Sequence, residues 1–190
     1  MPFTPYHFGP SGFLGLVFRK WIDIPVFVLA NVIVDVEVLV VMIFGLGWPP
    51  HRYCHTLLIG GVVGMLWGIA AYPLRHIFKK IMRIFHIPYK PHFLKMVISG
   101  IIGVWLHVLI DGFCHIDLRI FWPSKEFNWS FTPLGIITYI FTGHIYRNVI
   151  SIKELETICI AFFFASFIVY IIILLTSKKN VVKNKMSKEE

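Results

Sequence analysis

Long apolar segments separated by short polar or turn-forming stretches dominate the chain. Residues 24–46, 55–71, 93–110 and 157–175 are mainly apolar runs, and residues 131–146 form a shorter one. A helix needs about 20 mainly apolar residues to cross a hydrocarbon core of about 30 Å. We therefore predict an all-α fold, a polytopic transmembrane helical bundle of about five membrane helices.

Two shorter segments have a different pattern. Residues 12–18 predict a short N-terminal helix that ends before a pair of basic residues. Residues 72–91 alternate apolar with basic side chains, which predicts an amphipathic helix lying at the membrane interface. The prediction is one membrane-embedded helical domain over residues 1–176, followed by a charged, disordered tail over residues 177–190.

The composition agrees with a membrane protein and narrows its partners. The chain is 57% hydrophobic and 15% charged, with a mean hydropathy of +0.74. Its net charge of +8 is concentrated beside apolar segments, in residues 75–95 and 178–188. Basic clusters in such positions set membrane topology and contact anionic lipids. We expect membrane lipids as partners, an inner-membrane location and no binding of nucleic acid.

The sequence LHVLIDGFCHID at residues 106–117 carries the clearest chemical signal. His107, Asp111 and His115 recur every four residues, so a continuous helix would project them from one face. Ionisable groups at membrane depth usually mark a functional site. An imidazole and a carboxylate one turn apart can bind one divalent cation. A satisfied hydrogen bond, or an Asp111 that serves the helix end, stays open as the structural alternative.

Two further pairs of candidate residues lie near other apolar segments. Asp35 and Glu37 are two positions apart, so they point about 200° apart on a regular helix and only one can face a shared site. Asp35 is the expected ligand, whereas Glu37 serves either as a supporting group or as a catalytic base. His55 opens a predicted helix and is favoured as a ligand over His51, which follows two prolines.

Topology predicts that these residues meet at one membrane face. If the basic segment at residues 75–95 is cytoplasmic, the preceding helix begins outside and the following helix ends outside. His55 lies at the first of these positions, and His107 and Asp111 lie at the second. The second half of the first long segment, with Asp35, also lies towards the outside. We therefore expect the site at the extracytoplasmic face.

Five short motifs occur in a recognisable order: PFTPYHFGP, VIVDVE, HRYCHTLLIG, WLHVLIDG and FWP. In this order the chain resembles the YdjM-like membrane-bound, metal-dependent hydrolases, over roughly residues 7–123. The resemblance implies a ligand set drawn from the early histidine, the acidic pair, the histidine-rich helix start and the HxxxD pair. It also implies a distant similarity to zinc-dependent phospholipase C folds. The chain departs from the family pattern in having Asp and Glu, rather than two Asp, as its acidic pair.

Together these observations favour a membrane-embedded hydrolase with zinc as its cofactor and an amphiphilic, phosphoester lipid-like substrate. Its expected catalytic residues are Glu37 and His115. Its expected metal ligands are His7, Asp35, His55, His107 and Asp111. The alternatives are a metal or proton carrier that uses the same groups, and a scaffold whose polar residues pair internally. No serine-nucleophile, nucleotide-binding or HExxH motif is present in the sequence.

The topology can be tested by labelling single cysteines in a cysteine-free background in intact cells. Lys80→Cys, in the basic segment, is expected to resist a membrane-impermeant thiol reagent. Lys125→Cys, in the segment after Asp111, is expected to react. The reverse labelling pattern would move the site to the cytoplasmic side.

Overall fold

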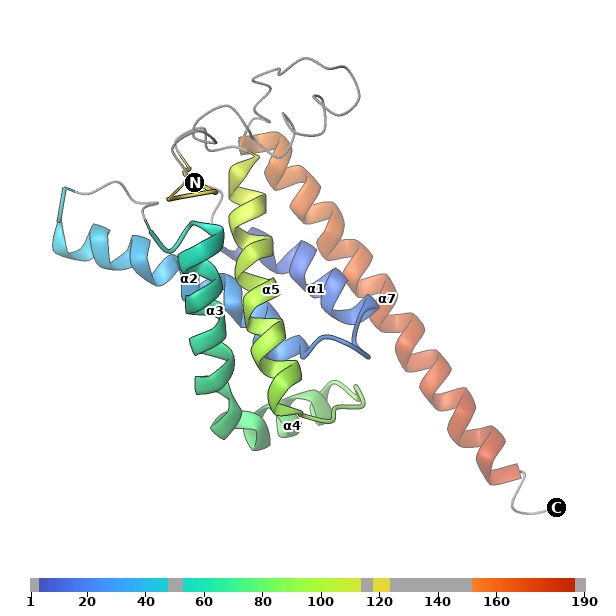
Figure 1. Cartoon of the computed structure of the whole chain (residues 1–190). Coiled ribbons are helices and arrows are strands. Elements are labelled where there is room, and N and C mark those ends of the chain that lie inside the picture. The colour runs from blue at the N-terminus through green and yellow to red at the C-terminus, as the bar shows by residue number, and fades with distance from the viewer. Residues whose placement is uncertain (1–3, 48–52, 114–117, 124–151, 187–190) are drawn as a thin grey trace, which may run out of the picture.

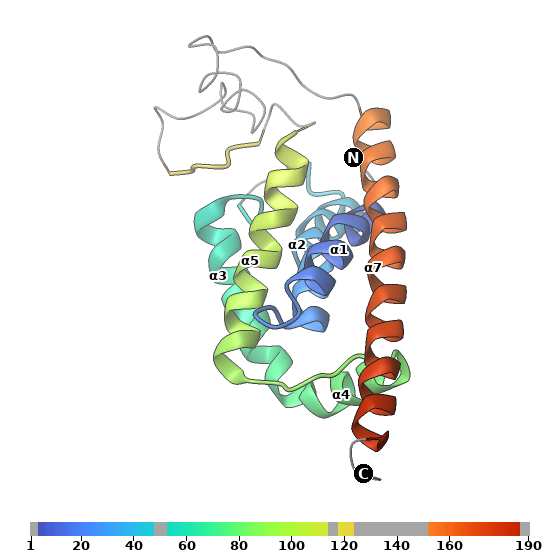
Figure 2. The same ribbon diagram turned by 90° about the vertical axis from the view of Figure 1, so that its right-hand side faces the viewer.

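Every regular element in the computed structural model is a helix, which confirms the all-α prediction for the described residues 4–47, 53–113, 118–123 and 152–186. Figures 1 and 2 show these helices packed into a bundle, with α7 along one side. In chain order they are η1 (Thr4–His7), α1 (Phe8–Val17), α2 (Ile24–Phe44), α3 (Leu57–Ala71), η2 (Tyr72–Leu74), α4 (Arg75–Ile84), α5 (Phe93–Gly112) and α7 (Ile152–Met186).

Four helical stretches among the described residues are long and apolar enough to cross a membrane: Ile24–Phe44, Leu57–Ile84, Phe93–Gly112 and Ile152–Ser177. The protein is therefore a membrane protein by the length and composition of its helices. About five membrane helices were expected; the fifth, at residues 131–146, lies outside the described residues. Figures 1 and 2 show α4 turning away from α3 to lie across one end of the bundle.

Helices α3 and α5 run side by side because glycines remove the side chains between them. A Cβ atom on Gly64 would lie 2.5 Å from the backbone oxygen of Gly100, and one on Gly68 would lie 2.5 Å from Cα of Val97. Neither contact is possible for a real Cβ atom. Small residues of this kind let membrane helices approach closely. The contact fixes the position of α3 along α5. It therefore determines which residues lie next to one another at the ends of the two helices.

The start of α2 is anchored to α5 by a buried acidic residue. Asp23 Oδ1 caps the helix by accepting from Val26 N at 3.4 Å, and its backbone N donates to Ser99 Oγ at 2.7 Å. Tyr89 Oη donates to the other carboxylate oxygen at 2.8 Å. Burial raises the pKa of the Asp23 carboxyl, against the opposing effect of the hydrogen bonds from Tyr89 and Val26.

Helix α7 packs against α1 and extends beyond the expected span. Ser166 Oγ donates to Gly9 O at 3.1 Å, and a Cβ atom on Gly9 would collide with the backbone oxygen of Cys159. The span was predicted at residues 157–175, whereas α7 runs from Ile152 to Met186. It thus continues into residues 177–186, which belong to the segment expected to be a disordered tail. Lysine is a good helix former, so its charge does not end the helix.

The α3–α5 contact can be tested with Gly64→Ala. The added methyl group must separate the helices, and overpacking of this kind costs typically about 1–3 kcal/mol. We expect a lower midpoint of thermal unfolding in detergent. Gly12→Ala is the control, because its Cβ atom would meet only the Ser166 side chain, at 3.4 Å. Equal stability of Gly64→Ala and Gly12→Ala would show that α3 and α5 are not in this close contact.

Candidate metal centre

Four acidic and histidine side chains converge at the end of the α3–α5 pair opposite α4. Asp35 comes from α2, His55 from the turn before α3, and His107 and Asp111 from the last turns of α5. His55 and His107 are 0% exposed and Asp111 is 2% exposed. Burying ionisable groups to this extent is costly unless each is paired or binds a metal ion.

Local structure places each of these residues. Helix α5 continues without interruption to Gly112, so His107 and Asp111 lie one turn apart on the same face. Thr56 caps α3, because its Oγ1 accepts from Ile59 N at 3.1 Å. The cap fixes the backbone beside His55 and directs that histidine towards α5 and α2.

The donor atoms lie close enough together to share one metal ion. His107 Nε2 lies 3.2 Å from Asp35 Oδ1 and 3.3 Å from Asp111 Oδ2. His55 Nε2 lies 3.5 Å and 3.8 Å from the same two oxygens. With zinc–ligand bonds of about 2.0–2.1 Å, tetrahedral donors lie about 3.3–3.4 Å apart. The four residues therefore fit a metal ion, and one donor atom from each lies within 4.8 Å of the others.

Glu37 lies on the outer side of His55, where it holds that ring in place. Its Oε2 atom is 3.4 Å from His55 Nδ1 and accepts from Cys54 N at 3.0 Å. Its Oε1 atom accepts from Tyr53 N at 3.1 Å. A carboxylate on Nδ1 fixes the proton there and leaves Nε2 available to a metal ion, as in many metal sites. Glu37 thus occupies the supporting position that the sequence analysis gave as one of its two roles.

His7 supports His107 in a similar way. The Nδ1 atoms of the two rings are 3.0 Å apart, so one of them donates and the other accepts. His7 Nε2 lies 3.3 Å from Asp111 Oδ1, the oxygen that does not face His55 and His107. If His107 donates from Nδ1, both rings are neutral, His107 Nε2 is available to a metal ion, and the His7 proton faces Asp111. The structure places His7 beside the four-residue group rather than within it.

The charge of the cluster favours a bound cation. Burial opposes a positive charge on His55, but the carboxylates of Asp35 and Glu37, one at each ring nitrogen, outweigh it and raise the pKa of His55. Asp35 and Glu37 are also the most open members, with side chains 15% and 17% exposed. The cluster therefore attracts cations and is approached from the side of α2.

The remaining expected residues have different outcomes. His51 and His115 lie outside the described residues, so the expected role of His115 as a base stays a prediction. The backbone N–H groups of Tyr53 and Cys54 that hold Glu37 could not be predicted, because almost any residue type supplies such a group. Comparisons with protein-family models, curated proteins and solved structures found no match for this chain.

Metal binding is the first consequence of this geometry to test. Detergent-purified protein is expected to contain a transition metal on elemental analysis, and His107→Ala is expected to lose it, because one of four donors is removed. His76→Ala is the control, since His76 lies on the exposed face of α4. No metal in the parent protein after incubation with zinc would contradict the metal centre.

Glu37→Gln provides a graded test of the support given to His55. Loss of a supporting carboxylate typically weakens metal affinity about 10–100-fold without abolishing it. We expect this reduction by competition with a chelator. The metal-free protein should be slightly less stable to heat, because Gln can accept from only one of the two backbone N–H groups. An affinity equal to that of the parent would remove Glu37 from the site.

Proposed function

We propose that the protein is a zinc-dependent hydrolase of the inner membrane that acts on an amphiphilic phosphoester at the extracytoplasmic face. The observation that carries the proposal is the convergence of donor atoms from Asp35, His55, His107 and Asp111, which lie within 4.8 Å of one another. The order of the sequence motifs and their resemblance to the YdjM-like hydrolases support the same assignment.

The donor set favours zinc over calcium and magnesium. Two imidazole nitrogens and two carboxylate oxygens match zinc, whereas calcium and magnesium prefer oxygen ligands alone and higher coordination numbers. A catalytic zinc also needs a position for water or substrate, and beside four protein donors this position is a fifth one. Asp35 is the most exposed of the four donors, so the site is most open at this residue. We assign the approach of water and substrate to this side.

The chain provides binding and orientation for the reaction. A bound zinc ion would supply a water molecule whose pKa is lowered to about 7, and would polarise the scissile group. His55, His107, Asp35 and Asp111 hold the ion. Glu37 and His7 orient the two imidazole rings through the nitrogens that face away from it. His115 remains our candidate for the general base.

The position of the cluster supports an amphiphilic substrate. His55 precedes α3 and Asp111 is next to the last residue of α5, so the donors lie at the ends of two membrane-spanning stretches. The polar head of a lipid-like molecule lies at this depth while its chains stay among the helices. The basic residues of α4 lie at the opposite end of the bundle, which supports an extracytoplasmic site through the positive-inside rule.

Asp111→Asn tests the proposed function. The substitution keeps the size and hydrogen-bonding capacity of the side chain but removes a charge that the metal needs. We expect hydrolysis of phosphatidate in mixed micelles with zinc-loaded protein to fall at least about 100-fold, the usual scale for loss of charge stabilisation. Asp23→Asn is the matched control, because Asn also caps helices well and Asp23 lies away from the cluster.

The outcomes separate the possible functions. Hydrolysis by the parent and by Asp23→Asn, but not by Asp111→Asn, supports the hydrolase. Metal binding without hydrolysis of any phosphoester lipid would contradict it and would favour a metal carrier. If none of the three proteins binds metal and none hydrolyses the lipid, the four residues form an internally paired polar cluster.

A further inference from the structure

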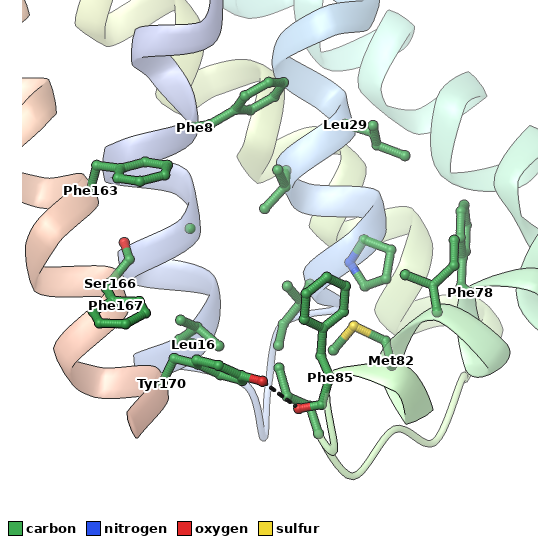
Figure 3. A pocket seen from close by; sticks show the side chains of 16 residues that line it. Phe8, Leu16, Leu29, Phe78, Met82, Phe85, Phe163, Ser166, Phe167 and Tyr170 are labelled. Carbon is green, nitrogen blue, oxygen red and sulfur yellow. Dashed lines mark hydrogen bonds between the residues drawn. The ribbon is translucent and has the colours of Figure 1, made fainter. Parts of the chain in front are cut away.

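A second feature, distant from the His and Asp cluster, is an apolar pocket between α1, α2, α4 and α7 (Figure 3). Its volume is about 610 Å³, within the range of pockets that hold small molecules. Its lining is almost entirely apolar, and includes Leu16, Leu29, Phe78, Met82, Phe163 and Phe167. A pocket of this composition suits a hydrocarbon chain.

The pocket opens towards the hydrocarbon of the membrane. Phe163 and Phe167 on α7 are 59% and 60% exposed, and Leu29 on α2 is 37% exposed. All three lie within stretches that are long and apolar enough to span the membrane. A lipid chain can therefore enter sideways from the bilayer without crossing a polar surface.

A basic cavity adjoins the apolar pocket. Its volume is about 380 Å³, it shares Ile87 with the apolar pocket, and it is lined by Lys79, Arg83, His86 and Tyr89 among others. No acidic side chain is among the described residues that line it. At the junction, Tyr170 Oη donates to Phe85 O at 3.1 Å, which joins α7 to the end of α4 (Figure 3). The surface thus changes from apolar to positively charged over a short distance.

We propose that these two cavities together bind one anionic phospholipid. An acyl chain occupies the apolar pocket, and the phosphate lies against Lys79 and Arg83. The occupant must combine a hydrocarbon chain with negative charge, which excludes a neutral lipid and a wholly apolar molecule. Arginine and lysine bind phosphate through charge-assisted hydrogen bonds, and basic residues at a membrane surface attract anionic lipids.

This lipid site is separate from the proposed catalytic site. Lys79 and Arg83 belong to α4, which lies across the end of the bundle opposite the metal cluster (Figures 1 and 2). None of the four candidate metal ligands lines either cavity. The lipid site can therefore exist whether or not the protein is a hydrolase.

Native mass spectrometry of the full chain in detergent, titrated with phosphatidylglycerol or with phosphatidylcholine, tests the proposal. We expect one phosphatidylglycerol to bind well before further lipids, and phosphatidylcholine to bind at least about tenfold more weakly. Equal affinity for the two lipids, or gradual addition of many lipids without a first preferred one, would overturn the proposal and indicate only a general lipid coat.

Two pairs of variants test the two parts of the site. Lys79→Gln with Arg83→Gln is expected to weaken phosphatidylglycerol binding at least about tenfold. Lys80→Gln with Lys90→Gln removes the same charge from exposed residues that line neither cavity, and should not. Leu29→Trp is expected to block the chain of either lipid. Val32→Trp is its control, because Val32 is equally exposed, at 37%, and does not line the pocket.

The pattern of losses decides the result. Loss of headgroup preference in Lys79→Gln with Arg83→Gln, together with loss of binding in Leu29→Trp, supports a single lipid held at both ends. If either variant binds like its control, the corresponding cavity does not hold the lipid and the proposal fails. Thermal unfolding in detergent verifies that each variant is folded, and all the substituted side chains are exposed in the structure.

Discussion

The carboxylate of Asp111 lies inside a helical bundle, within reach of three histidines. Its oxygens are 3.3 Å from His7 Nε2 and His107 Nε2, and 3.8 Å from His55 Nε2. A buried carboxylate without positive charge nearby is strongly unfavourable, so this cluster requires protonated imidazoles or a cation. The second carboxylate, Asp35, lies beside the same two ring nitrogens as Asp111 Oδ2. When the imidazoles are neutral, one divalent metal ion would balance the two carboxylates in this arrangement.

The packing of α3 against α5 is what makes that arrangement possible. His55 is positioned by the start of α3, and His107 and Asp111 by the end of α5, so the distance between them depends on how closely the two helices approach. Gly64 and Gly100 permit that approach near the middle of the two helices. Residues far from the metal centre, at the level of the apolar core, thereby control the separation of its donor atoms.

Part of the fold and site could be predicted from the sequence because it depends on local periodicity. The spans follow from apolar length, and the pairing of His107 with Asp111 follows from four-residue spacing on one helix. That only one of Asp35 and Glu37 belongs to the four-residue group follows from their angular separation on α2. The supporting contacts of Glu37 and His7 could not be predicted, because they depend on backbone N–H groups and ring orientations set by tertiary packing. The continuation of α7 to Met186 could not be predicted from apolar length, because it lies beyond the apolar residues.

The central claim is that two imidazole nitrogens and two carboxylate oxygens bind one metal ion. X-ray absorption spectroscopy of zinc-loaded protein measures this most directly. The account predicts a first shell of nitrogen and oxygen at about 2.0–2.1 Å, with the outer-shell scattering of two imidazole rings and no sulfur. That scattering should decrease in His55→Ala and in His107→Ala. A shell containing sulfur at about 2.3 Å, or a hydrated ion without imidazole scattering, would contradict it.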